Sequence, residues 1–409
     1  MRTIVVSDMH LGCGASPDIT GGARAFEAML LALAATPTRV VLNGDSFDFL
    51  AQEFAPAGSA AQVMHAFTED AVCAMLLSAL ARVLSVGGEL VVRAGEHDRA
   101  LEEPAVRGLL LRALAAGDAV PTRVRFYAHR CPTVLEIGGA RVVVAHDVYE
   151  RDSAADRWLA VQVLNPLRRQ YGVGLADLLR PDYVSAVAAA LVANPTAAKL
   201  VLRLADPDVW PKLAGSLTGS AMQLPRVFAG AGLTPRERVV MTAALDPGVV
   251  LGVRPADHRD LEHARLKLLR FVLARHVTDG GAPRHIGEAE WRAARRLARR
   301  FGASAAILGH SRAVGWRSED GLTALDAGTW AWLLAPPTAR DGDAVWRRTL
   351  ATWQRSPRID GPQDGLRLRW TAALIEPRPA NDGAQLALVE WRQGGGLLRW
   401  HECSLPRAP

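Results

Sequence analysis

Hydrophobic and polar positions follow two different rhythms in the first 150 residues. Short apolar runs, typical of buried strands, occur at 3–6, 39–42, 90–93 and 141–145. Between these runs, apolar residues recur at three- and four-residue intervals, which predicts helices over 23–35, 60–86 and 105–116. The stretch 123–135 is rich in β-forming residues. Strand–helix–strand alternation of this kind predicts a layered α/β fold.

The pattern changes between residues 151 and 286. This region reads as helical segments interrupted by prolines and glycines, and none of its segments ends in a polar motif of the kind that follows the flanking strands. We therefore predict that 1–150 is the first part of an α/β core and that 151–286 is a helical insertion, which could act as a cap or lid.

The α/β pattern resumes over 287–334, the predicted second part of the core. A helix is expected over 288–301, a strand over 305–308 and paired strands over 313–316 and 322–325. The last section, 335–409, is predicted to be an irregular segment rich in Pro, Gly and Arg followed by a β-rich extension. Its alternating runs predict antiparallel strands at 366–374, 384–391 and 397–403.

Five short polar motifs come directly after predicted strands. They are Asp8-Met9-His10, Gly44-Asp45-Ser46-Phe47-Asp48, Gly95-Glu96-His97-Asp98, His146-Asp147 and Gly309-His310-Ser311-Arg312. In α/β sheets, ligands gather beyond the carboxyl ends of the strands. One such edge would bring together the side chains of Asp8, His10, Asp45, Glu96, His97, His146 and His310.

Mixed carboxylate and imidazole ligands suit Mn, Fe or Zn better than Ca or Mg. Two such ions about 3.5–4 Å apart lower the pKa of a bound water and neutralise the oxygens of a phosphate ester. An imidazole beside them can protonate the departing alkoxide. Each motif alone has a plainer reading as a turn, because Asp and Gly are common turn formers. Their joint occurrence, in order and at strand ends, favours a metal-dependent hydrolase site.

The motif series resembles the calcineurin-like metallophosphoesterases, whose pattern is D-x-H, G-D-x-x-D, G-N-H-[DE], H and G-H-x-H. The match covers roughly 1–150 and 286–332. The resemblance implies a four-layered α/β/β/α sandwich with one or two divalent ions, of which Mn is expected and Fe and Zn are alternatives. It also implies that Asp8 and His10 hold the first metal, Asp45 bridges, and His146 and His310 hold the second. His97 would be the acid near the leaving group, with Asp98 orienting it.

Two positions depart from that family pattern. Glu96 stands where the family has Asn, and its carboxylate can still bind the second metal. Arg312 stands where the family has a final His ligand, and a guanidinium that stays protonated cannot bind a metal. Water could replace that ligand, the first ion could bind weakly, or the site could be mononuclear. Arg312 is then a candidate contact to substrate phosphate, and a degenerate protein with a binding or regulatory role stays open.

The sequence resembles most closely the branch that includes UDP-2,3-diacylglucosamine pyrophosphatases. The shared features are the single His146-Asp147 motif, the late Gly328-Thr329-Trp330 and an insertion between the fourth and fifth motifs. In that branch the insertion covers the metals and holds acyl chains. The resemblance therefore implies a phosphodiester or pyrophosphate substrate that is small or lipid-linked. The insertion equally suits an ordinary small helical core.

The charge balance raises a second enzymatic possibility. The net charge is +6, and all but three of the 48 basic residues are arginine, which a GC-rich genome would explain. Five arginines crowd the helix predicted at 288–301, which suits a nuclease acting on DNA or RNA. A solvated helix face is the plainer reading, so nucleic acid is a possible partner but not the favoured one. The oligomeric state cannot be read from the sequence.

The remaining composition points to a cytoplasmic protein. The four cysteines, Cys13, Cys73, Cys131 and Cys403, are widely separated and form no Cys-x-x-Cys pair. The N-terminal residues lack the three sections of a signal peptide. The most apolar long segment, 183–205, is broken by Asn194, Pro195 and Lys199, so no transmembrane segment is expected.

Overall fold

The computed structural model describes a set of residue ranges spread along the chain. These are residues 1–9, 11, 23–47, 49, 59–95, 97–115, 121–148, 232–239, 260, 263, 267, 284–310, 314–330, 333–334, 341–355, 366–367, 369–379, 382–392 and 396–408. The chain divides into two compact units. The first contains Met1–Arg151, Gly281–Trp332 and Leu368–Pro409, and the second contains Asp152–Gly280 and Leu333–Arg367. The predicted insertion at 151–286 lies almost wholly outside the described residues.

The first unit contains a seven-stranded sheet with the order β15-β14-β13-β1-β2-β3-β4. Four of its strands are mutually parallel, and three from the C-terminal region are antiparallel. Because β13 pairs with β1, the C-terminal strands complete this sheet. The strands are β1 (Arg2–Val6), β2 (Thr38–Asn43), β3 (Glu89–Arg93), β4 (Val124–Tyr127), β13 (Thr371–Pro377), β14 (Ala384–Trp391) and β15 (Leu397–Leu405).

A six-stranded sheet has the order β5-β6-β8-β10-β9-β7. At its centre β6, β8 and β10 run parallel, while β9 and β10 form the predicted antiparallel pair. The strands are β5 (Thr133–Ile137), β6 (Ala140–Ala145), β7 (Arg284–His285), β8 (Ala305–Leu308), β9 (Val314–Glu319) and β10 (Leu322–Ala327).

The alternation of side chains along each strand builds four layers. In β1, Ile4 packs in the core shared with the N-terminal helices, and its neighbour Val5 packs in the core between the two sheets. In β6, Val142 faces the core between the sheets, whereas Val143 faces the core under α13. The predicted α/β/β/α sandwich is thereby confirmed.

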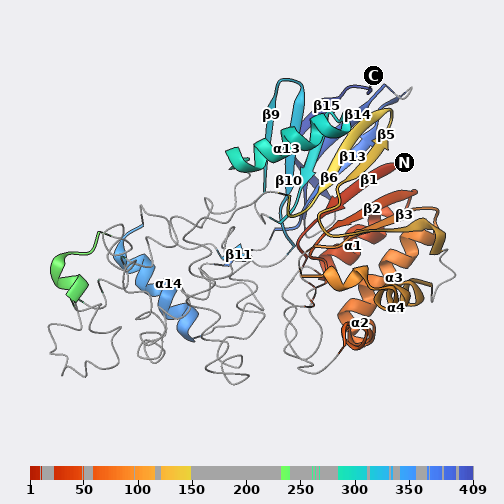
Figure 1. Cartoon of the computed structure of the whole chain (residues 1–409). Helices are drawn as coiled ribbons and strands as arrows, with labels where there is room; N and C mark the ends of the chain where they lie inside the picture. The colour runs from red at the N-terminus through yellow and green to blue at the C-terminus, as the bar shows by residue number, and fades with distance from the viewer. Residues whose placement is uncertain are drawn as a thin grey trace. The chain divides into compact units, whose positions relative to one another are not determined.

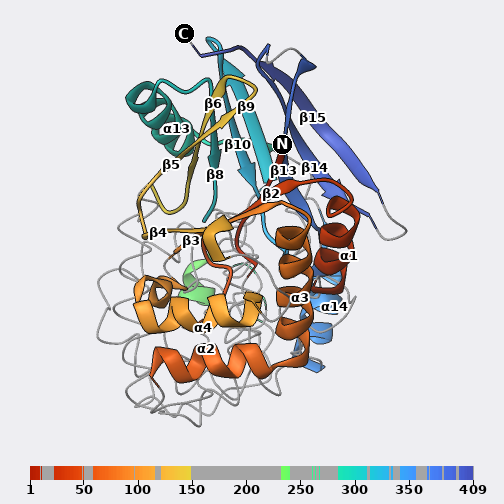
Figure 2. The same cartoon turned by 90° about the vertical axis from the view of Figure 1, so that its right-hand side faces the viewer.

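Helices cover the outer face of each sheet (Figure 1). Figure 2 shows α1 and α3 side by side on the seven-stranded sheet, where they are in contact. The described helices of this unit are α1 (Ala23–Leu33), α2 (Ala60–Glu69), α3 (Ala71–Ser85), α4 (Pro104–Ala115) and α13 (Glu288–Phe301), with the short 3₁₀ helices η1 (Arg99–Glu102) and η2 (Pro121–Arg123).

The single helix predicted over 60–86 is wrong, because the chain breaks at Asp70 into α2 and α3. Asp70 has an extended backbone, and its carboxylate accepts hydrogen bonds from the N–H groups of Val72 and Cys73, both at 3.0 Å. This is the N-cap geometry that Asp favours. Both helices pack on the same core, so the apolar periodicity continues across the break. This continuous pattern concealed the N-cap at Asp70.

The stretch 335–365, predicted to be irregular, contains helix α14 (Asp343–Arg355) in the second unit. Residues 343–355 contain neither Pro nor Gly, and Trp346 and Thr349, one turn apart, are buried. The composition of the surrounding stretch hid this local pattern. The same unit contains a two-stranded sheet of β11 (Leu333–Leu334) and β12 (Leu366–Arg367). Within the described ranges, no helix has the length and apolarity needed to cross a membrane.

Candidate metal centre

Loops at the carboxyl ends of five strands meet where the two sheets adjoin. Asp8 follows β1, Asp45 follows β2, and His97 and Asp98 follow β3, while His146 follows β6 and His310 follows β8. Backbone bonds link neighbouring loops: Asp8 N–H donates to Gly44 O at 3.1 Å, and Gly309 N–H donates to Ala145 O at 3.1 Å. Across the sheets, His310 N–H donates to Asp8 Oδ2 at 2.9 Å.

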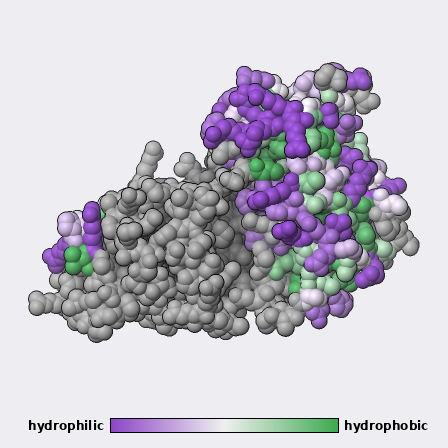
Figure 3. All heavy atoms as spheres, viewed as in Figure 1, coloured by the Kyte–Doolittle hydropathy of each residue, from purple (hydrophilic) through white to green (hydrophobic). Residues whose placement is uncertain are grey.

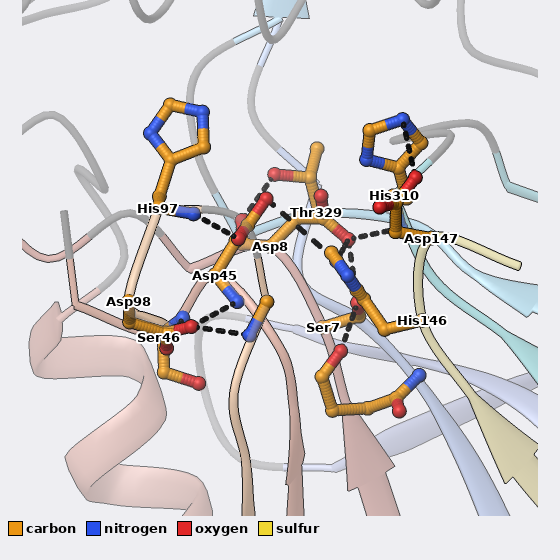
Figure 4. Close-up of polar contacts among 12 residues, drawn as sticks. Ser7, Asp8, Asp45, Ser46, His97, Asp98, His146, Asp147, His310 and Thr329 are labelled. Atoms are coloured by element: carbon orange, nitrogen blue, oxygen red, sulfur yellow. Dashed lines mark hydrogen bonds and ion pairs between the residues drawn. The ribbon is translucent and has the colours of Figure 1, made fainter. Parts of the chain in front are cut away.

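Asp45, His146 and His310 form a group that could hold a metal ion. One ligand atom from each lies within 4.8 Å of the others. Nε2 of His146 is 3.7 Å from Oδ2 of Asp45 and 3.7 Å from Oδ2 of Asp8 (Figure 4). These separations are longer than hydrogen bonds, and they suit side-chain atoms that bind one metal ion between them.

Buried polar atoms of two members of this group lack hydrogen-bond partners within the described part of the chain. They are Oδ2 of Asp45 and both ring nitrogens of His146, and both residues are fully buried. Buried polar atoms are normally paired, because an unpaired one costs about 1–3 kcal/mol. A carboxylate and two imidazoles are a suitable donor set for Mn, Fe or Zn. The chemistry of these residues therefore fits a divalent metal.

Backbone strain concentrates at this centre. Among the described residues, six other than glycine have positive φ, and four of them are Asp8 at 54°, Asp45 at 50°, Asp147 at 50° and His310 at 78°. Such conformations cost free energy and persist where the surrounding structure over-determines them, typically at functional sites. Each of these four is the second residue beyond the end of its strand.

Two motif glycines allow the backbone to approach the His146 ring. Gly44 has φ +81°, and a Cβ atom placed there would overlap the ring. A Cβ atom at Gly309 would overlap both the ring and the Ser7 hydroxyl. The glycine in each motif is thus required by the packing of a buried imidazole between two loops.

Burial and charge together set the ionisation of the centre. Burial raises the pKa of Asp45 to about 7, although the nearby imidazole of His146 opposes this shift. Burial works to lower the pKa of His146, but the carboxylates of Asp45 and Asp8 outweigh it and raise the pKa to about 9. Without a cation, the protein therefore retains protons here that a bound divalent ion would displace.

Asp98 fastens the second and third loops together. Its carboxylate accepts backbone N–H bonds from Ser46 at 2.7 Å, Asp45 at 3.2 Å, Phe47 at 3.3 Å and Gly95 at 2.5 Å. The role predicted for Asp98 in orienting the His97 ring stays a prediction. His97 N–H donates to Asp45 Oδ1 at 2.9 Å, and its ring lies on the side of Asp45 away from His310 (Figure 4).

Residues that the motif pattern did not assign to the site hold Asp8 in place. The Ser7 hydroxyl donates to Asp8 Oδ2 at 2.5 Å, and the Thr329 hydroxyl donates to Asp8 O at 2.6 Å. The neighbouring Trp330 is fully buried and packs edge-on against Phe26, with ring centroids 5.0 Å apart. The weak Gly328-Thr329-Trp330 signal therefore marks a support for the first loop.

Asp147 was noted in the sequence only as part of the His146-Asp147 motif, and His129 lies outside all five motifs. The structure instead places Nε2 of His129 3.0 Å from Asp147 Oδ2, to which Arg130 Nε–H also donates at 2.9 Å. Burial works to raise the pKa of Asp147, but the charges of His310 and Arg130 hold it below the usual value. No spacing in the sequence signals this contact, because it depends on how β4 and β6 lie in space.

A buried arginine bridges the two sheets below the metal centre. Arg93 of β3 donates to Asn43 Oδ1 at 2.9 Å and to Thr133 Oγ1 at 2.6 Å, and Asn43 Nδ2 donates to Ala145 O at 3.1 Å. Burial lowers the pKa of Arg93 to about 10. This polar bridge joins the strands that carry Asp45 and His146.

Three predicted site residues, His10, Glu96 and Arg312, lie outside the described residues. The other predicted site residues, Asp8, Asp45, His97, Asp98, His146 and His310, are all at the seam between the sheets. Their roles in catalysis and metal binding remain predictions.

No family model matches the chain, and no curated protein matches it. Among solved structures, a Vps29 single mutant from Entamoeba histolytica aligns at 10% identity and TM-score 0.30 over 99% of each chain. Wild-type Vps29 complexed with Zn from the same organism aligns at 6% identity and TM-score 0.29 over 99% of each chain. GAP50 of Plasmodium, the anchor in the inner membrane complex, aligns at 9% identity and TM-score 0.34 over 100% of this chain and 89% of the GAP50 chain. Likeness this low assigns no function.

Proposed function

We propose that this chain hydrolyses a phosphodiester or pyrophosphate bond with the help of one or two divalent ions, expected to be Mn. The observation that supports this proposal most is the group of Asp45, His146 and His310 at the ends of strands from both sheets. Buried atoms of Asp45 and His146 that have no hydrogen-bond partner among the described residues support the proposal further. The five-motif resemblance to calcineurin-like metallophosphoesterases supplies the reaction class.

Metal ions held by Asp8, Asp45, His146 and His310 would activate water and neutralise charge on the phosphate oxygens. The chain itself holds these ligands rigidly before substrate arrives. Asp98 fixes the loop of Asp45 through backbone N–H groups, and Ser7 fixes the carboxylate of Asp8. Preorganised ligands of this kind need little reorganisation during the reaction.

His97 is the proposed proton donor to the leaving group. It is half-buried, and its backbone N–H bond to Asp45 Oδ1 anchors it beside the metal group. An imidazole is suited to this task near neutral pH. The substrate class, a small or lipid-linked phosphate ester, is proposed from the resemblance to the branch that includes UDP-2,3-diacylglucosamine pyrophosphatases.

Turnover of bis-p-nitrophenyl phosphate and p-nitrophenyl phosphate by chelator-treated protein, with Mn²⁺ added back, tests the proposal. We expect Mn²⁺-dependent hydrolysis that falls by more than about 100-fold in Asp45→Asn, since even outer-sphere changes cost 10–100-fold. Asp382→Asn, an exposed position in the turn before β14, is the control. If the wild-type chain hydrolyses neither compound with any divalent metal, the result would support a degenerate binding protein instead.

One surface feature favours a nuclease as the second candidate. Figure 3 shows a hydrophilic patch over the region where Figure 1 draws α13. Its exposed residues include Arg292, Arg296, Arg299 and Arg300 of α13. Phosphate contacts by such residues would make binding fall steeply with salt.

Binding of single- and double-stranded oligonucleotides across a salt series tests this second candidate. A nuclease should bind with a steep salt dependence that is reduced in the double variant Arg296→Gln/Arg300→Gln. Weak binding that does not change with salt would remove the nuclease reading and leave α13 as a solvated face.

A further inference from the structure

The two carboxylate oxygens of Asp147 contact different side chains. Oδ1 is 3.7 Å from Nε2 of His310, while Oδ2 is 3.0 Å from Nε2 of His129 and accepts from Arg130 at 2.9 Å. The Asp147 side chain is only 9% exposed. A nearly buried carboxylate thus lies between the metal group and a pair of basic side chains that hold it.

The basic pair comes from a segment between β4 and β5. Arg130 has φ 56°, which turns the chain so that both side chains reach Asp147. The backbone N–H of His129 donates to Glu102 Oε1 at 2.8 Å, and Glu102 ends the 3₁₀ helix that begins directly after Asp98. A continuous series of contacts therefore runs from the third motif through His129 and Asp147 to His310.

This arrangement differs from a second metal site. The group that could hold an ion within the described part of the chain contains His310 but neither Asp147 nor His129. Oδ2 of Asp147 contacts one nitrogen of His129 and one of Arg130. Its Oδ1 lies beside one nitrogen of His310 (Figure 4). His310 therefore belongs to the metal group and also contacts Asp147. At 3.7 Å this contact is electrostatic and longer than a hydrogen bond. A carboxylate beside the ring of a metal-binding histidine is the usual device that orients it.

We propose that Asp147 is a positioning residue that orients His310 for metal binding and is itself locked by His129 and Arg130. The inference rests on the proposed metal-dependent function. Its consequence is that metal affinity depends on residues that never touch the metal, including one contributed by the segment after β4.

Calorimetric titration of the chelator-treated full chain with Mn²⁺ tests this role. Asp147→Ala should weaken Mn²⁺ affinity by about 10–100-fold, as is typical when the outer partner of a metal ligand is lost. Asp320→Ala is a matched control, since Asp320 also has φ 50° but lies exposed in the β9–β10 turn. Both variants place alanine in a left-handed conformation, so a shared loss of affinity would reflect strain alone and overturn the proposal.

His129 supplies a second test that leaves the metal loops unchanged. His129→Leu removes the contact to Oδ2 and should weaken Mn²⁺ affinity by about tenfold. His129→Gln retains a side-chain donor and should recover most of that loss. If Asp147→Ala does not fold, Asp147→Asn keeps the shape of the side chain and should weaken affinity in the same direction.

The outcomes separate the two proposals. Wild-type affinity in Asp147→Ala or Asp147→Asn together with His129→Leu would overturn the positioning role while leaving the metal site intact. A wild-type chain that binds no Mn²⁺ at all would refute the proposed function itself, and the positioning role with it.

Discussion

The two sheets contribute different chemistry to the same centre. The seven-stranded sheet supplies the carboxylates of Asp8, Asp45 and Asp98, whereas the six-stranded sheet supplies the imidazoles of His146 and His310. Each half also carries its own carboxylate support: Asp98 holds the loop of Asp45, and Asp147 adjoins His310. The described group that could hold an ion combines a carboxylate from one sheet with two imidazoles from the other, a donor set that suits a transition metal. The centre therefore depends on the two sheets being held together in a fixed relation.

Gly44→Ala should damage this seam most. The new Cβ atom would overlap the His146 ring at a position whose φ is +81°. Strain and overpacking together should lower the free energy of unfolding by about 3 kcal/mol and weaken Mn²⁺ binding. Gly321→Ala has a similar φ of +76° with nothing within 4 Å, so it isolates the strain. Urea denaturation gives the free energy of unfolding of both variants. Equal losses would show that the packing of the His146 ring does not require glycine at position 44.

Arg93→Met should weaken the bridge between the halves. It removes the donor to Asn43 and Thr133, and bonds from a charged donor are worth about 1.5–3 kcal/mol each. Relief of the buried guanidinium offsets part of this loss, so we expect a destabilisation of about 2 kcal/mol. Arg125→Met, on the exposed face of the adjacent β4, should change stability by less than about 0.5 kcal/mol. A stable Arg93→Met protein with unchanged metal affinity would mean that apolar packing alone aligns the sheets.

The metal-free protein should lose stability as the pH rises. Asp45 has its pKa raised from 3.8 to about 7, so its contribution falls between these values; His146, raised from 6.5 to about 9, extends the fall. The melting temperature of chelator-treated protein should therefore decrease from pH 5 to 9, and Mn²⁺ should restore it most at the upper end. Asp45→Asn should flatten the lower part of the curve. A melting temperature that rises with pH would contradict this account.

The loops of the centre could be predicted from the sequence because their signals are local. Asp8, Asp45, His146 and His310 each follow an apolar strand directly or after one residue, and parallel strands bring such positions to one edge. The ends of strands β1, β2, β3, β6 and β8 were predicted to within one residue.

The supporting contacts could not be predicted in this way, because they join segments that only the fold brings together. His129 and Asp147 are 18 residues apart, and Thr329 and Asp8 are 321 apart. The break at Asp70 was concealed for a different reason, since α2 and α3 share one core and so continue one apolar pattern. Helix α14 was missed because the composition of its neighbours outweighed its own periodicity.

The position of a bound Mn²⁺ in crystals, located by its anomalous scattering, tests the central claim most directly. The account predicts a peak at the seam between the sheets, within bonding distance of Asp45, His146 and His310. No peak there in crystals soaked with Mn²⁺, or a peak bound only by side chains of one sheet, would contradict it.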